Sequence, residues 1–156
     1  MHIAVYKCPP KLTVDMVTEA VRFYASTLMN RQLVKNLTVK ALFKDEGVDG
    51  SCDAYCGDNN NKARDFIITI MPKLSKNNIL RVLAHEMVHV KQYATGESKQ
   101  YERTPYVTKF RDVMVNTSTT DYWDLPWEIE AYGRELGLYV RFMEHWKNVK
   151  TKADKT

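Results

Sequence analysis

Hydrophobic and polar residues alternate with two different periods along the chain, and each change of period predicts a new element. Apolar residues recur at helical spacing over residues 14–29, directly after Thr13, whose hydroxyl can cap a helix. Residues 37–44 alternate with period two instead, except at Leu42, which predicts a half-buried strand. Shorter strands are expected at residues 3–7 and 51–56, and a loop at residues 58–61.

Residues 66–71 differ from the other strand candidates because they form a nearly continuous apolar run that Pro72 ends. Such a run is typical of a central strand that is covered on both faces. A long helix then begins at Ser75 or Asn77, continues to about Tyr93 and is stopped by Gly96.

The stretch from residue 97 to residue 122 is polar and contains several breakers, so we expect a loop-rich connection with a helical part at residues 107–115. A last helix is expected from about Asp124 and Pro126 to about Trp146. This order predicts one α+β domain over residues 1–147, followed by a polar, basic tail at residues 148–156.

Composition narrows the class of protein. No apolar run approaches the roughly 20 residues that cross a bilayer, and the first residues lack the layout of a signal peptide, so we expect a cytoplasmic protein. The odd set Cys8, Cys52 and Cys56 fits reduced thiols. The net charge of +4 comes without an arginine-rich stripe, so nucleic acid is not an expected partner.

Candidate chemistry lies in the long helix, where His85, Glu86 and His89 form the pattern HExxH. Residues four apart lie on one helix face, so both imidazoles can bind a single ion. Glu86 is displaced by about 100° and can hold a water without binding the ion itself. Apolar residues cover most of the remaining circumference, and the gap between them contains the two histidines together with Arg81 and Gln92. This pattern predicts a buried helix with one polar slot.

A catalytic zinc usually takes three protein ligands, so a third is needed from elsewhere. His2 and His145 are poorly placed, near the two ends of the chain. On the last helix, Glu128 lies within an apolar arc of about 220°, whereas Glu130 lies among polar residues. A buried carboxylate needs a compensating cation, so Glu128 is the predicted ligand and Glu130 a solvated surface charge.

Glu135 lies on the same buried arc, two turns after Glu128. It can orient a ligating histidine through the free ring nitrogen, or it can pair with a buried arginine or lysine. The sequence does not separate these two roles.

These residues resemble the gluzincin metallopeptidases, in which a helix carries HExxH and a later helix supplies a glutamate. The segment at residues 128–131 looks like the E-x-E-A segment of several minimal members, where the first glutamate binds zinc. Tyr132 departs from the Asp or Asn that often follows. Small uncharacterised metallopeptidase-like proteins of bacteria and phages share this layout. The DNA-associated SprT-like group is a weaker match, because no third histidine lies between Val90 and Glu144.

The resemblance implies a minimal zincin-like domain, with a small mixed sheet packed on the N-terminal helix and on the HExxH helix. Residues 66–71 would be its central strand, and residues 51–56 an edge strand that lines the cleft and pairs with an extended peptide.

We therefore expect a zinc-dependent metallopeptidase that acts on a peptide or protein, with zinc held by His85, His89 and Glu128 and with Glu86 as general base. The alternatives are a zinc-binding regulatory or partner-binding module with restricted or no proteolysis, and a nucleic-acid-associated SprT-like protease. The segment 97–122 can cover the cleft or form a static connection. Four tyrosines are unranked candidates for stabilising the oxyanion: Tyr93, Tyr101, Tyr106 and Tyr132.

Overall fold

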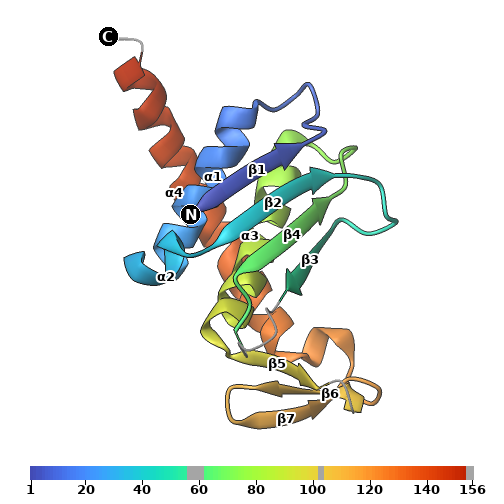
Figure 1. Cartoon of the computed structure of the whole chain (residues 1–156). Helices are drawn as coiled ribbons and strands as arrows, with labels where there is room; N and C mark the ends of the chain where they lie inside the picture. The colour runs from blue at the N-terminus through green and yellow to red at the C-terminus, as the bar shows by residue number, and fades with distance from the viewer. Residues whose placement is uncertain (56–61, 102–103, 154–156) are drawn as a thin grey trace.

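The computed structural model describes residues 1–55, 62–101 and 104–153, so the loop expected at residues 58–61 and Cys56 lie outside the described residues. The fold is α+β, as the order of elements predicts (Figure 1). Its elements are, in chain order, β1 (His2–Tyr6), α1 (Val14–Leu28), α2 (Arg31–Lys35), β2 (Thr38–Phe43), β3 (Gly50–Tyr55), β4 (Asp65–Ile70), α3 (Lys76–Thr95), β5 (Ser98–Tyr101), β6 (Thr104–Phe110), β7 (Val113–Asn116), the 3-10 helix η1 (Tyr122–Asp124) and α4 (Pro126–Ala153).

Side-chain caps set the beginnings of helices α1 and α3. The hydroxyl of Thr13 accepts a hydrogen bond from the amide of Met16 and so begins α1, as predicted. Ser75 caps α3 in the same way. Gly96 ends α3 with a φ of 80°, a left-handed conformation that glycine adopts without the steric cost of a Cβ.

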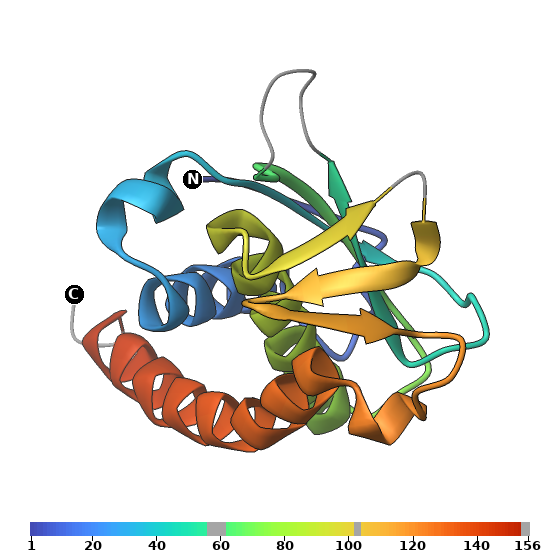
Figure 2. The same ribbon diagram turned by 90° about the horizontal axis from the view of Figure 1, so that it is seen from below.

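The larger sheet is mixed and has the strand order β1-β2-β4-β3. Strands β1, β2 and β4 are parallel, and β3 pairs antiparallel with β4 at the edge. The predicted internal position of the 66–71 strand is therefore confirmed, and so is the edge position of the 51–56 strand. Helices α1, α3 and α4 lie on one face of this sheet (Figures 1 and 2), and on the other face of β4 Thr69 is 5% exposed, so the expectation that β4 is covered on both faces is confirmed only in part. Ile67, on the other face, is only half-buried.

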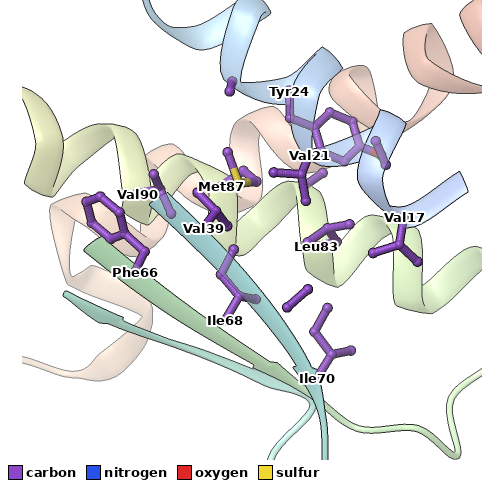
Figure 3. Close-up of a cluster of buried hydrophobic side chains, with 14 of the residues drawn as sticks. Val17, Val21, Tyr24, Val39, Phe66, Ile68, Ile70, Leu83, Met87 and Val90 are labelled. Atoms are coloured by element: carbon purple, nitrogen blue, oxygen red, sulfur yellow. The ribbon is translucent and has the colours of Figure 1, made fainter. Parts of the chain in front are cut away.

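The hydrophobic core lies between this sheet and the pair α1 and α3. Figure 3 shows Val17, Val21 and Tyr24 of α1 beside side chains of α3, facing those of β2 and β4. The Tyr24 hydroxyl donates a hydrogen bond to the carbonyl of Leu80, at 3.1 Å. Burial of this apolar surface stabilises the fold and fixes α3 against the sheet.

The segment after α3 differs from the expectation. Residues 98–116 form an antiparallel sheet of order β5-β6-β7, so the loop-rich connection with a helix at residues 107–115 is wrong. Thr108 and Phe110 are 3% and 5% exposed and share one face of β6, which is the period-two burial of a strand. Arg111 makes the turn to β7 with a φ of 53°.

Helix α4 is longer than predicted, since it reaches Ala153 instead of ending near Trp146, and residues 148–153 of the expected tail are helical. Ile129, Leu136 and Val140 are exposed, so its apolar arc is narrower than predicted. The buried positions of α4 form one stripe at helical spacing: Glu128, Ala131, Glu135, Leu138 and Phe142.

Among the described residues, no helix is both long enough and apolar enough to cross a membrane. Cys8 and Cys52 are free cysteines.

Candidate metal centre

The polar slot of helix α3 faces α4, where it meets the buried stripe of that helix. His85 and Glu86 are 7% and 5% exposed, and His89 is half-buried. The predicted slot residues Arg81 and Gln92 both contact α4, through Glu135 and Glu130 respectively. The apolar remainder of α3 packs into the core, so the slot is the side of α3 that is available for polar chemistry.

The three predicted ligands converge. The Nε2 atoms of His85 and His89 lie 3.2 Å apart, and Glu128 Oε2 lies 3.2 Å from the Nε2 of His85. Glu128 Oε1 lies 3.5 Å from the Nε2 of His89. One donor atom from each residue falls within 4.8 Å of the others, so the group can hold a metal ion.

The other two histidines of the chain lie elsewhere. His145 Nε2 lies 2.8 Å from Glu19 Oε1, on the far part of α4. His2 is an exposed residue of β1. The structure therefore does not bring either of them to the centre.

Glu135 contacts both a histidine and an arginine of α3, although the side chain of Arg81 is 42% exposed and not buried as one of the two expected roles requires. Its Oε2 lies 3.1 Å from the Nδ1 of His85, and its Oε1 accepts a hydrogen bond of 2.6 Å from Arg81. The carboxylate therefore receives the outer ring nitrogen of His85 while a guanidinium holds it in place. The Nε2 of His85 is left facing Glu128.

Electrostatics favour a cation at this position. Glu86, Glu128 and Glu135 are buried together, and Arg81 is the one lysine or arginine among the described residues that line the cleft. Burial raises the pKa of Glu86 to about 7, although the nearby His89 and His85 oppose that shift. Burial also acts to raise the pKa of Glu128, but hydrogen bonds with His85 and His89 outweigh it and hold that pKa well below its ordinary value.

The centre opens into a cleft of about 820 Å³ between β3 on one side and the pair α3 and α4 on the other. Gly50, Ser51 and Cys52 of the edge strand line it. Gly50 lies so close to α3 that a Cβ added there would collide with Val82 Cγ1 and come within 2.7 Å of Glu86 Oε1. The absence of a side chain at this position therefore lets the edge strand approach Glu86.

Two of the four candidate tyrosines, Tyr93 and Tyr132, line the cleft. Tyr106 is 65% exposed on β6 and does not line it, and the side chain of Tyr101 lies outside the described residues. Burial raises the pKa of Tyr93 to about 12.

Sequence reasoning missed Tyr122, whose hydroxyl donates a 2.8 Å hydrogen bond to Glu128 Oε2. It lies on η1, outside any periodic pattern, so no spacing could reveal it. Within the described part of segment 97–122, Tyr122 is also the one residue that lines the cleft.

Glu130 is not the solvated surface charge that the helical wheel predicts. Its side chain is 12% exposed and lies 3.0 Å from Lys91 Nζ, 3.1 Å from Arg134 Nε and 3.4 Å from Arg111 Nη2. Glu130 is not part of the group formed by His85, His89 and Glu128 and lies instead in a network of ion pairs.

The arrangement thus combines two imidazoles, a carboxylate ligand and a separate buried carboxylate, Glu86, at the wall of one cleft. Comparisons with models of known protein families, with curated proteins and with solved structures found no match.

Proposed function

We propose that the chain is a zinc-dependent metallopeptidase whose metal ligands are His85, His89 and Glu128. The observation that carries the proposal is the convergence of these donors next to Glu86, in a cleft that an edge strand borders. Two imidazole nitrogens with one carboxylate oxygen form a ligand set typical of catalytic zinc, which keeps a further position for water or substrate.

The surroundings of the donors fit such an ion. The outer nitrogen of each histidine faces an oxygen, from Glu135 for His85 and from Gln92 for His89. The Nε2 atoms of the two histidines therefore face each other, and that of His85 also faces Glu128. When bound, zinc would act as a Lewis acid and lower the pKa of water at this site.

Glu86 is the residue to which we assign proton transfer. It would accept a proton from the water that attacks the peptide carbonyl and pass it to the leaving amine. In the metal-free protein, burial raises its pKa to about 7, which favours acceptance of a proton. The hydroxyls of Tyr93 and Tyr132 are the described candidates for donating a hydrogen bond to the developing oxyanion.

Substrate binding would use the edge of the larger sheet. Among the described strands, β3 pairs with β4 alone, so its other side can accept an extended peptide as an added strand. A peptide bound in this way would run along the cleft past Gly50 and Glu86.

The test compares zinc-loaded wild type with Glu86→Gln, using pools of unstructured peptides and mass spectrometry. We expect Glu86→Gln to keep one zinc ion and to lose hydrolysis. The control, Glu144→Gln, changes an exposed glutamate of α4 and should behave as wild type. Hydrolysis by Glu86→Gln at the wild-type rate would contradict the assignment of the general base. A wild type that holds zinc and cleaves none of the pools would favour the alternative of a zinc-binding partner module.

A further inference from the structure

Gln92 joins one of the proposed metal ligands to the second glutamate of the E-x-E segment. It is 1% exposed and lies three residues after His89 on α3. Its Oε1 lies 2.8 Å from the Nδ1 of His89. Its Nε2 donates two hydrogen bonds to the start of α4, one of 3.0 Å to the carbonyl of Trp127 and one of 3.1 Å to Glu130 Oε2.

These partners fix which way the amide of Gln92 points. A backbone carbonyl and a carboxylate only accept hydrogen bonds, so the NH₂ end of the amide must face them. The oxygen end must then face His89, and an amide oxygen only accepts. The Nδ1 of His89 therefore carries the proton, and the lone pair of its Nε2 is left for a metal ion.

We propose that Glu130 and Gln92 are positioning residues that set the tautomer and ring orientation of His89. The inference rests on the proposed metal site, and it assigns a role to each glutamate of the E-x-E segment. Glu128 binds the ion directly, while Glu130 acts on the other side of the same ligand set, through the amide of Gln92.

Ion pairs with Lys91, Arg134 and Arg111 hold the side chain of Glu130 beside Gln92. Its Oε1 lies 3.0 Å from Lys91 Nζ and 3.1 Å from Arg134 Nε, and its Oε2 lies 3.1 Å from the Nε2 of Gln92. Lys91 is itself buried between Glu130 and Glu97, with its Nζ 2.6 Å from Glu97 Oε2. Oε2 of Glu130 is thus left to accept the hydrogen bond from Gln92.

His85 has an equivalent arrangement with different chemistry. A carboxylate, Glu135, receives its Nδ1 directly, and Arg81 holds that carboxylate. The amide inserted at His89 carries no charge, so its orientation depends on the acceptors that it meets on α4, the carbonyl of Trp127 and Glu130. The two histidines should therefore respond differently when their outer partners are changed.

The first test measures zinc affinity by competition with a chelator, and the absorption spectrum of the Co²⁺ form. Gln92→Leu should bind zinc about 10–100-fold more weakly than wild type and show altered Co²⁺ bands, because His89 loses the acceptor for its Nδ1 proton. The control is Gln100→Leu, at an exposed position of β5, which should change neither property. Unchanged affinity and spectrum in a folded Gln92→Leu would overturn the proposal.

A second test separates positioning from general damage to the fold. Gln92→Glu alone places a second carboxylate next to Glu130 and should weaken zinc binding. Adding Glu130→Gln places an amide donor opposite the new carboxylate at position 92. The double variant should therefore recover part of the lost zinc affinity. A double variant that binds zinc no better than Gln92→Glu would overturn the proposal.

A third variant, His89→Ala, tests the proposed metal site separately from the positioning role. His89→Ala should abolish tight zinc binding if the site is right, whatever Gln92 does. If His89→Ala leaves zinc binding intact, the metal site itself is wrong. If His89→Ala abolishes it and Gln92→Leu does not weaken it, the positioning role alone fails.

Discussion

Gly50→Ala perturbs the contact between the edge strand β3 and helix α3. The added Cβ would collide with Val82 Cγ1 and lie 2.7 Å from Glu86 Oε1 and 3.3 Å from its Cδ. Val82 is β-branched and has one strongly preferred rotamer in a helix, so it cannot simply turn away. Either β3 must move outward or the carboxylate of Glu86 must leave its position.

The magnitude follows from the cost of overpacking, which is about 1–3 kcal/mol for a methyl group forced into a filled space. We expect the free energy of unfolding of the metal-free protein to fall by about that amount in a urea titration. Hydrolysis should fall as well, because Glu86 is displaced. Zinc content should not change, since His85, His89 and Glu128 are not among the nearest atoms to the new Cβ.

The reasoning would be refuted by a Gly50→Ala variant that unfolds within about 0.5 kcal/mol of wild type and hydrolyses peptides normally. That result would mean that β3 does not approach Glu86 as closely as the structure has it. A variant that loses zinc instead would show that Gly50 supports the ligands and not the general base.

Three further predictions address other parts of the structure. Gly137→Ala should raise the free energy of unfolding by about 0.5–1 kcal/mol, measured by urea titration, because the helical Gly137 has open space where a Cβ would lie. Glu135→Gln should weaken zinc binding about 10–100-fold in a chelator competition, since His85 loses its carboxylate partner, and unchanged affinity would exclude that role. In the metal-free protein the pKa of Glu86 is raised from 4.5 to about 7, so its contribution to stability is present below pH 4.5 and is lost as the pH rises through 7. The unfolding free energy of wild type minus that of Glu86→Gln should therefore decrease by roughly 2–3 kcal/mol across this range, and a difference that does not change with pH would contradict the shift.

Several elements of the inner part of the fold could be predicted because their apolar residues recur with a clear period. In β2, Val39 and Ala41 are buried in the core of the fold and Lys40 is exposed, so an alternation broken only at Leu42 describes the strand. The HExxH helix was predictable for the same reason, since apolar side chains occupy nearly all positions outside the slot. Parallel pairing of β1 with β2 and β4 could not be read from any of these strands, because pairing depends on contacts between distant segments.

The sheet β5-β6-β7 was hidden because its buried face includes a polar residue and its turn lacks the usual residues. Thr108 occupies a buried position that a hydrophobicity pattern counts as polar. The turn between β6 and β7 places Arg111 in the left-handed region, where glycine or asparagine is the usual signal. Neither feature can be recognised until the strands are paired.

At the site, helical phase separated Glu128 from Glu130 but misjudged the surroundings of Glu130. The wheel assigns each residue to a face of its own helix and contains no neighbouring helix. Lys91 and Gln92 of α3 cover the side of α4 on which Glu130 lies, so a position that looks solvated is 12% exposed. The same limit left the two roles of Glu135 unresolved, since both partners come from α3.

The most direct test of the account is the zinc content of purified wild type, Glu128→Gln and Glu130→Gln after saturation with zinc and removal of the excess. We predict one ion per chain in wild type and in Glu130→Gln, the latter with weaker affinity, and none in Glu128→Gln. Zinc retained by Glu128→Gln and lost from Glu130→Gln would contradict the assignment of the third ligand, and with it the central claim.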